Sequence, residues 1–466
     1  MTIKAENHAK KKQSTKNSSS SSRKAKKDVS VNEKTHLLPK KHGHGDFDGA
    51  SFTGGVMNLS TTIIGAGVMA LPATMKVLGL GLGIVSILFV AFLTEASISM
   101  LLKFGRHSSS YGSIMHDAFG NVGKKMLEGF VVINNVGVLI VYMIIIGDVL
   151  SGTSASGIHH AGVLEGWFGE QWWTGRFCIL VVSTICVLAP LTSFKRIDSL
   201  SFTSGLAVAL AIVFLVITAG ITVYKCFDGT IAMPRLLPDI TDVNSIWKLF
   251  TVVPVLVTAY ICHFNVHSIE SELEDPSLIR PVVQTSLLLC STVYIMTSFF
   301  GFLLFGDATL DDVLANFDKN LGVPFSYQLN DVVRVSYALH LMLVFPIVFH
   351  PLRLNLDALL FPTSTPLLSD NVRFSWITIG LNSVVFLAAN FIPSIWDAFQ
   401  FTGATTAVCI GFIFPASIAL RDTHGQATTK DKLLSAFMIG LAVFASSVAI
   451  YSDAYTLFKK TPSPRA

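Results

Sequence analysis

The residues whose types and spacing suggest chemistry are concentrated in the stretch 57–72, MNLSTTIIGAGVMALP, at the start of a long apolar segment. Gly65 and Gly67 are poor helix residues, and Pro72 has no backbone N–H group. In a hydrocarbon environment an unpaired backbone group costs several kcal/mol, so such a break is tolerated only where it lines a cavity or packs on protein. The stretch therefore predicts a membrane helix with a break that either lines a cavity or packs on protein.

A break at this place would expose two kinds of backbone group. The amides of Gly65, Ala66 and Gly67 would lie at the N-terminus of a second half-helix, where the positive dipole end favours a carboxylate. The carbonyl groups that end the first half, near Thr61 and Thr62, suit an ammonium group. An amino acid zwitterion needs both. The alternative is close packing of small residues between membrane helices.

A second stretch, residues 254–267, PVLVTAYICHFNVH, repeats the pattern, because Pro254, Thr258, Tyr260 and His263 interrupt another apolar segment. Broken segments at corresponding positions of two halves are the best sequence indicator of a secondary transporter's binding site. We therefore predict that Thr258 and Tyr260 contribute to the same substrate site as the first stretch.

The whole composition is that of a membrane protein. Of 466 residues, 51% are hydrophobic and 14% are charged, whereas about a quarter are charged in a soluble domain. Many apolar runs are near the length of about 20 residues that crosses a bilayer as a helix. We predict an all-α polytopic transmembrane domain over 51–457, followed by a short tail, 458–466. Eleven spans are expected near 52–76, 80–102, 127–150, 175–191, 201–224, 247–267, 282–305, 331–358, 372–392, 395–419 and 432–456.

The two broken segments fall in the first and sixth spans. This leaves five helices in each half and one extra helix, which is the number expected for a five-plus-five inverted repeat. The sequence contains no HxxxxD, GxSxG or HExxH motif. An enzyme, a metal site, a cofactor and a nucleic-acid partner are therefore not expected.

The first 50 residues differ from the rest, because they are basic, rich in Ser and poor in apolar side chains. Such a segment is expected to be a disordered cytosolic tail. Glu33, Leu37 and Leu38, in EKTHLLPK, have the spacing of an acidic dileucine signal that sorting adaptors read, although a chance match is the alternative.

Lys and Arg set the expected orientation. They are frequent in the connections that alternate to the cytosolic side, and those on the other side hold only Lys76, Lys225, Arg235 and Lys319. The N-terminus is therefore expected in the cytosol and the C-terminus in the lumen or outside the cell. The basic residues of the C-terminal tail argue weakly the other way.

Three longer motifs carry a resemblance. GGVMNLSTTIIGAGVMALP, VTAYICHFNVHSIESELEDP and FPIVFHPLR resemble the amino acid/auxin permease family, which includes the animal system A and N neutral amino acid transporters. The resemblance covers about residues 50–457 and is greatest to the plant vacuolar amino acid transporters. It implies the inverted-repeat fold first described for a bacterial leucine transporter, and secondary active transport of amino acids coupled to an ion gradient.

The resemblance also carries over individual residues. Asn58 matches the Asn of the family motif NLS-x-x-I-x-G-x-G, which is implicated in sodium or substrate handling, and His263 falls in the CH segment of the sixth helix. Sodium-coupled relatives place a Thr just before the VP or FP of the eighth helix. Here no hydroxyl lies between Ala338 and Phe345, so a proton is favoured over sodium.

Ionisable residues inside spans are costly and are candidates for coupling. His263 and His340 are expected near the middle of the membrane, and His titrates in the physiological range. We predict that His263, with His340 second, carries the coupling proton; a neutral, hydrogen-bonded His is the alternative reading. Glu95 is expected to pair with a Lys or Arg of the cytosolic side.

The third span contributes the last candidates. Asn135 and Tyr142 are seven residues apart and share one helix face, and an aromatic hydroxyl there could bind a carboxylate. Hydrogen bonding between helices is the alternative.

The expectation is thus a proton-coupled transporter that moves neutral or acidic amino acids across the vacuolar membrane toward the cytosol. The alternatives are an amino acid sensor at the vacuole or lysosome with little transport, sodium-coupled uptake at the plasma membrane, and a channel.

Overall fold

The structure, a computed structural model, describes residues 49–105, 110–155, 158–362, 365–392 and 402–460. The chain divides into two units, Met1–Glu33 and Lys34–Ala466, and every described residue lies in the second unit. The proposed sorting signal, Glu33, Leu37 and Leu38, lies outside the described residues.

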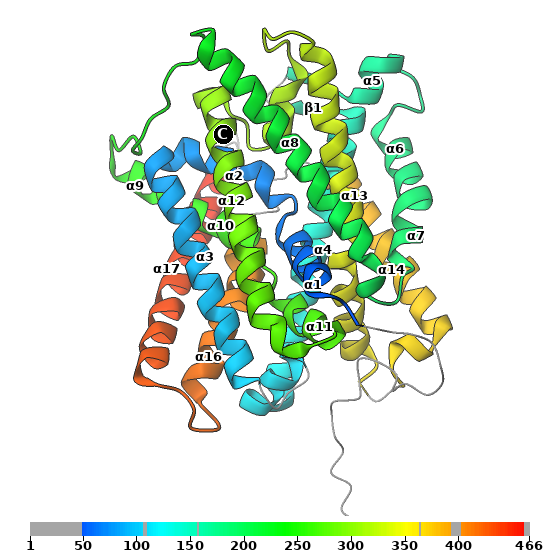
Figure 1. Ribbon diagram of the computed structural model, residues 1–466, viewed down its shortest axis with the longest axis vertical. Coiled ribbons are helices and arrows are strands. Elements are labelled where there is room, and N and C mark those ends of the chain that lie inside the picture. The colour runs from blue at the N-terminus through cyan, green and yellow to red at the C-terminus, as the bar shows by residue number, and fades with distance from the viewer. Residues whose placement is uncertain (1–48, 106–109, 156–157, 363–364, 393–401, 461–466) are drawn as a thin grey trace, which may run out of the picture. The chain divides into compact units, whose positions relative to one another are not determined.

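Helices dominate the described chain (Figure 1). The first half comprises α1 (Phe52–Ile63), α2 (Gly67–Leu78), α3 (Leu80–Phe104), α4 (Tyr111–Ser151), α5 (Val163–Phe168), α6 (Arg176–Ser183), the π-helical turn η2 (Thr184–Leu188), α7 (Ala189–Thr192), the 3-10 turn η3 (Asp198–Leu200) and α8 (Ser201–Phe227). The short strands β1 (Gly152–Ala155) and β2 (Ile158–Ala161) pair antiparallel, with Gly152 opposite Ala161.

The second half begins with α9 (Val243–Phe250), and its elements repeat the pattern of a broken helix followed by continuous ones. They are α10 (Val252–Tyr260), α11 (His263–Glu272), η4 (Pro276–Leu278), α12 (Ile279–Phe305), η5 (Gly306–Ala308), η6 (Val313–Asp318), α13 (Ser326–Leu360), η7 (Leu367–Ser369), α14 (Asn371–Phe391), η8 (Gly403–Ala407), η9 (Cys409–Ile413), α16 (Phe414–Arg421) and α17 (Thr429–Lys460).

Most of these helices are candidate membrane spans. In the described chain, nine helical segments are long and apolar enough to cross a membrane, and α1 with α2, bent by 55°, forms a tenth candidate. The apolar stretch Arg176–Thr192, where the fourth span is expected, is shorter. The prediction of an all-α polytopic protein is confirmed, with nine to ten candidate spans among the described residues where eleven were predicted.

Some helices extend beyond the predicted spans. The third span, expected at 127–150, belongs to α4, which begins at Tyr111 and changes direction at Gly120, where φ is 66°. Glycine adopts this left-handed conformation without the steric cost of a Cβ. The sixth span is built from α9, α10 and α11 rather than from one helix.

The first break lies at Gly65 and Ala66, where the sequence predicts it, but Pro72 takes no part in it. Helix α1 ends when the amide of Ile64 bonds to the carbonyl of Ser60 at 2.7 Å, and α2 restarts at Gly67. Pro72 lies inside α2, not at the break. It packs against α12, where a Cβ on Gly301 would lie 2.8 Å from its ring.

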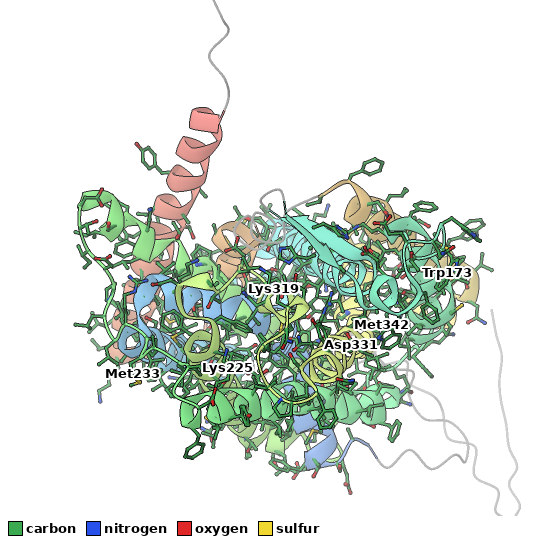
Figure 2. The ribbon with its side chains drawn as sticks, turned by 90° about the horizontal axis from the view of Figure 1, so that it is seen from above. Trp173, Lys225, Met233, Lys319, Asp331 and Met342 are labelled. Carbon is green, nitrogen blue, oxygen red and sulfur yellow. The ribbon has the colours of Figure 1, made fainter. Side chains whose placement is uncertain are left out.

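The central helices position the break. Helix α13 packs on both α4 and α8, while α12 packs on α1, α2, α3 and α8. Viewed from above, Lys319 and Asp331 lie over the middle of this end of the helices, and Met233 and Trp173 lie toward opposite edges (Figure 2). The connections after α4 and α12 contact each other, since His160 pairs with Asp318.

Candidate functional site

The two helix breaks lie side by side and enclose a small cavity. It contains about 320 Å³ of space between atoms, including space open to solvent. Residues from α1, α2, α4, α10, α11 and α13 line it: Thr62, Ile63, Gly65, Ala66, Gly67, Val138, Tyr142, Thr258, Ile261, Phe264 and Val348. None of these lining residues carries a charged side chain. The structure thus brings together six of the residues that the sequence places at a substrate site.

The N-terminal end of α2 meets Tyr142 of α4. The amides of Val68 and Met69 are already bonded to the carbonyls of Gly65 and Ala66, and the Tyr142 side chain lies against Gly65 at the same break. A Cβ on Gly65 would overlap the Tyr142 hydroxyl. The Tyr142 hydroxyl therefore lies beside the N-terminal end of α2 and lines the same cavity. A carboxylate there could accept a hydrogen bond from this hydroxyl.

Two threonine hydroxyls face the same cavity as acceptors. Thr62 Oγ1 donates to the carbonyl of Asn58, and Thr258 Oγ1 donates to the carbonyl of Pro254, both at 2.9 Å. Since each hydroxyl has one hydrogen, both are left with acceptor lone pairs only. Thr62 also accepts from Asn265 Nδ2 at 3.0 Å. Acceptors of this kind suit an ammonium group.

Two buried tyrosines that the sequence analysis did not select hold the breaks in place. Tyr294 Oη lies 2.6 Å from the carbonyl oxygens of both Ile63 and Ala259, one at each break. Tyr337 Oη donates to the carbonyl of Gly65 at 2.6 Å. An unpaired carbonyl at a break needs such a donor in hydrocarbon. An aromatic hydroxyl inside an apolar span was the only available signal for them.

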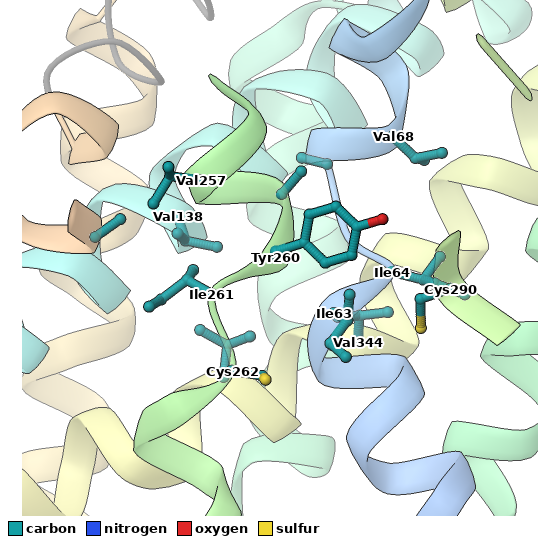
Figure 3. Close-up of a cluster of buried hydrophobic side chains, with 14 of the residues drawn as sticks. Ile63, Ile64, Val68, Val138, Val257, Tyr260, Ile261, Cys262, Cys290 and Val344 are labelled. Carbon is teal, nitrogen blue, oxygen red and sulfur yellow. The ribbon is translucent and has the colours of Figure 1, made fainter. Parts of the chain in front are cut away.

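Three predicted site residues do not line the cavity. Thr61 Oγ1 donates to the carbonyl of Ser204 at 3.0 Å, on α8. Asn135 Nδ2 donates to the carbonyl of Val348 at 3.3 Å. Tyr260 Oη lies 2.8 Å from Ser291 Oγ, and its ring lies between the two unwound segments (Figure 3). These side chains join neighbouring elements instead. The local sequence indicates which segment carries each polar side chain but not which neighbour that side chain meets.

His263 begins α11, directly after the second break. Ser97 Oγ donates to the carbonyl of Gly411, so it must accept from His263 Nε2, which lies 3.1 Å away. His263 therefore has its hydrogen on Nε2. Its Nδ1 is enclosed and has no hydrogen-bond partner among the described residues. That nitrogen therefore carries an unpaired acceptor lone pair.

The other proposed coupling residues are also buried. His340 Nδ1 lies 2.7 Å from the carbonyl of Ala207, and its ring lies 4.8 Å from that of Tyr337. Asn58 is 2% exposed, and its Oδ1 has no partner among the described residues. His340 thus joins α13 to α8, while Asn58 presents an unpaired acceptor beside Thr62.

Charged residues lie away from the cavity. Glu95 accepts from Gln284 Nε2 at 3.1 Å, so the expected pairing with a Lys or Arg is replaced in the structure by a neutral amide. Asp148 pairs with Arg176. In the described part of the chain, no group of three His, Cys, Asp or Glu side chains could hold a metal ion.

A polar cluster covers the end of the helices where the connections after α4 and α12 meet. His160 Nδ1 lies 2.5 Å from Asp318 Oδ2, and both side chains are buried. Nearby Asp312 caps η6 by accepting from the amide of Leu314. Burial raises the pKa of the Asp312 carboxyl to about 7.

The fold defines a class of protein: an all-α polytopic membrane protein of the inverted-repeat type, with a cavity between its two broken helices. A solved manganese transporter from Eremococcus coleocola has a similar fold, with a TM-score of 0.53 and 12% identity over 93% of both chains. The model of the family described as transmembrane amino acid transporter protein matches residues 48–456. The chain belongs to this family.

Relatives from Arabidopsis thaliana extend over almost the whole chain. It is 67% identical to amino acid transporter AVT6A over 435 residues, which is 92% of this chain and 94% of that protein. It is 65% identical to amino acid transporter AVT6B over 423 residues, covering 90% and 93% respectively. Amino acid transporter AVT6C is 43% identical over 91% of this chain and 98% of its own length.

Proposed function

We propose that this protein is a secondary active amino acid transporter, coupled to protons, that moves neutral amino acids across the vacuolar membrane toward the cytosol. The observation that carries the proposal is the cavity at the paired breaks. Its lining combines a helix N-terminus and a phenol hydroxyl, which suit a carboxylate, with threonine acceptors, which suit an ammonium group. Family membership and the names of the Arabidopsis relatives, which are amino acid transporters, support the same substrate class.

The lining of the cavity favours neutral substrates over acidic ones. Apart from the polar groups that suit the zwitterion, it is formed by Ile63, Val138, Ile261, Phe264 and Val348. A second carboxylate would be desolvated there without a cation, which is costly. We therefore narrow the substrate class from neutral or acidic amino acids to neutral ones with small or apolar side chains.

His263 is the proposed proton carrier. Its free Nδ1 can accept a proton, and the added charge would lie at the positive end of the α11 dipole, where a cation is disfavoured by about 0.3–1 kcal/mol or more. Protonation would therefore bias α11 away from this conformation. Proton binding that shifts the conformational equilibrium of a half-helix in this way would couple the proton to transport.

Sodium is the competing coupling ion. The side-chain oxygen of Asn58 is free to coordinate a cation, but the segment Leu341–Val344 of α13 adds no side-chain oxygen ligand. A hard cation requires several oxygen ligands. The vacuolar location and the direction rest on the family resemblance and on an acidic lumen, from which protons and substrate would leave together.

The test uses purified full-length protein in sealed liposomes. Labelled glutamine, alanine and glutamate are supplied with an imposed pH gradient and no sodium, and then with a sodium gradient and no pH gradient. We expect proton-driven uptake of glutamine and alanine and little uptake of glutamate. Uptake that required sodium would refute the proton proposal, and uptake of glutamate alone would refute the substrate class.

A variant isolates the role of His263. His263→Gln keeps a hydrogen-bond donor near Ser97 but cannot be protonated. We expect it to lose accumulation driven by the pH gradient while retaining exchange of labelled for unlabelled substrate. Full pH-driven accumulation by this variant would remove His263 from the coupling step. His267→Gln, at a buried histidine one turn further along α11, is the matched control.

A further inference from the structure

A second hollow lies behind α10, on the side away from the candidate site. It contains about 680 Å³ of space between atoms, including open space, and lies between α3, α10, η9 and α17. We call it the lateral groove. Its lining is almost wholly apolar and includes Leu93, Val257, Phe412 and Met438. No charged side chain is among its lining residues.

The lateral groove opens toward the surface that faces the bilayer. Phe89, which lines it, is 41% exposed, and Val85 and Phe444 on the same helices are also exposed apolar residues. In a membrane span, exposed apolar side chains of this kind contact lipid hydrocarbon. Whatever enters the groove therefore comes from the lipid phase.

One end of the lateral groove is polar. Ser86 of α3 and Ser446 of α17 both line it. The two helices run antiparallel, because Lys103 near the end of α3 pairs with Asp431 near the start of α17 at 2.6 Å. Ser86, early in α3, and Ser446, late in α17, thus lie toward the same end. The groove has hydroxyls at this end and only hydrocarbon at the other.

Ser446 provides an observation that points to a ligand. A serine within a helix commonly bonds to the carbonyl four residues before it, as Ser298 does to Tyr294 at 2.6 Å. The Ser446 hydroxyl oxygen is enclosed, yet it has no hydrogen-bond partner among the described residues. An unpaired hydroxyl in an apolar medium is costly. A hydroxyl-bearing ligand in the groove would remove that cost.

We propose that the lateral groove is a sterol site, with the sterol hydroxyl on Ser446 and the ring system extending toward Leu93 and Phe412. A sterol is a rigid apolar body with one small polar group at one end, which is the distribution of polarity along the groove. A phospholipid acyl chain leaves Ser446 unpaired, and a phosphate head group finds no cation in the lining.

The site matters for the rest of the protein because α10 separates it from the cavity. Val257 of α10 lines the lateral groove, while the next residue, Thr258, lines the candidate site. A rigid ligand bracing α10 against α17 stabilises the half-helix that leads to the second break. This inference does not depend on the identity of the transported substrate or of the coupling ion.

The test is photolabelling of the purified full-length protein in phosphatidylcholine vesicles. The probe is a photoreactive cholesterol analogue with its hydroxyl intact, and labelled peptides are mapped by mass spectrometry. Ser446→Ala removes the hydrogen bond, and Ser447→Ala, at the exposed neighbouring position, is its control. Ser86→Phe fills the polar end of the groove, and Val85→Phe adds the same ring to the adjacent exposed position.

We expect saturable labelling of α3, α10 and α17 that unlabelled cholesterol competes away. Loss of one hydrogen bond should weaken binding by about fivefold in Ser446→Ala, and Ser86→Phe should reduce labelling at least tenfold. Both controls should stay within twofold of the native protein. If Ser86→Phe does not fold, as judged by its elution and thermal midpoint, the Ser446 and Ser447 pair decides the test.

Three outcomes would overturn the proposal. The first is labelling spread evenly over the lipid-facing helices and insensitive to both groove variants. The second is equal binding by Ser446→Ala and the native protein. The third is competition by a free fatty acid as strong as that by cholesterol, which would assign the groove to an acyl chain.

Discussion

The contact between Gly65 and Tyr142 allows the proposed substrate site to be tested by packing alone. Replacing Gly65 with Ala adds a methyl group that overlaps the Tyr142 hydroxyl and lies 2.9 Å and 3.3 Å from two ring carbons. Carbon atoms in contact prefer about 3.5–4.0 Å. Tyr142 is 2% exposed and cannot swing into solvent. Gly65→Ala must therefore move the phenol or the first break.

The expected cost follows from this overlap. Adding a methyl group to a packed interior typically costs about 1–3 kcal/mol. Tyr142→Phe removes the atom with the worst overlap but leaves the ring carbon at 2.9 Å. The double variant should therefore recover part of the loss. We expect a coupling free energy of about 1–2 kcal/mol between the two substitutions, within the range found for residues in contact.

Two measurements separate packing from binding. The free energy of unfolding of the purified protein in detergent should fall in Gly65→Ala and partly recover in the double variant. Transport of labelled glutamine should stay low in both, because Gly65→Ala displaces the phenol and the double variant has no hydroxyl to donate to the substrate carboxylate. Tyr142→Phe alone should weaken substrate binding by about 10- to 100-fold, the effect of a hydrogen bond to a charged group of about 1.5–3 kcal/mol.

A matched control removes the general effect of replacing glycine in a helix. Gly129 lies in α4, and a Cβ there would meet no atom within 4 Å. Gly129→Ala should leave stability unchanged or raise it by about 0.5–1 kcal/mol. Two results would refute the reasoning. One is that the changes in unfolding free energy of Gly65→Ala and Tyr142→Phe add up to that of the double variant. The other is that Gly65→Ala transports substrate as well as the native protein.

Three further predictions concern other parts of the structure. Because the pKa of Asp312 is raised to about 7 by burial, its protonated form is favoured in the fold, and stability should decline as pH rises from about 4 to about 7. The free energy of unfolding of Asp312→Asn should equal that of the native protein near pH 4 and exceed it at pH 8 by about 2 kcal/mol. This figure is roughly half of the 1.4 kcal/mol that each pKa unit would contribute, because the side chain is partly exposed. Equal stabilities in thermal melts at pH 8 would contradict this prediction. Tyr294→Phe should lower the unfolding free energy by about 1–3 kcal/mol, because it removes the one hydroxyl hydrogen that the carbonyls of Ile63 and Ala259 share; an unchanged denaturation midpoint would show that water or another group replaces it. Val138→Ala enlarges the cavity beside the proposed side-chain site and should shift the transport preference toward larger neutral amino acids by about tenfold in kcat/KM; an unchanged ratio of phenylalanine to alanine transport would place the substrate side chain elsewhere.

Much of the architecture could be predicted from local patterns. Long apolar runs identify membrane helices because each span must satisfy its own backbone hydrogen bonds. Paired interruptions in the stretches 57–72 and 254–267 then identify the broken helices, and the structure places the second break at Ile261 and Cys262. The same reasoning placed Pro72 wrongly, because a proline inside a helix can be accommodated when a neighbouring helix offers a glycine such as Gly301.

The sequence by itself determined which segments cross the membrane, that two of them break, and which backbone groups the breaks release. These follow from composition, periodicity and the conformational limits of Gly and Pro. The direction in which each polar side chain points was decided only by the tertiary structure. Thr62 and Tyr142 face the cavity, whereas Thr61 and Tyr260 bond to neighbouring helices. In hydrocarbon a hydrogen bond stabilises a polar side chain strongly, and the packing of distant helices determines which partner is within reach.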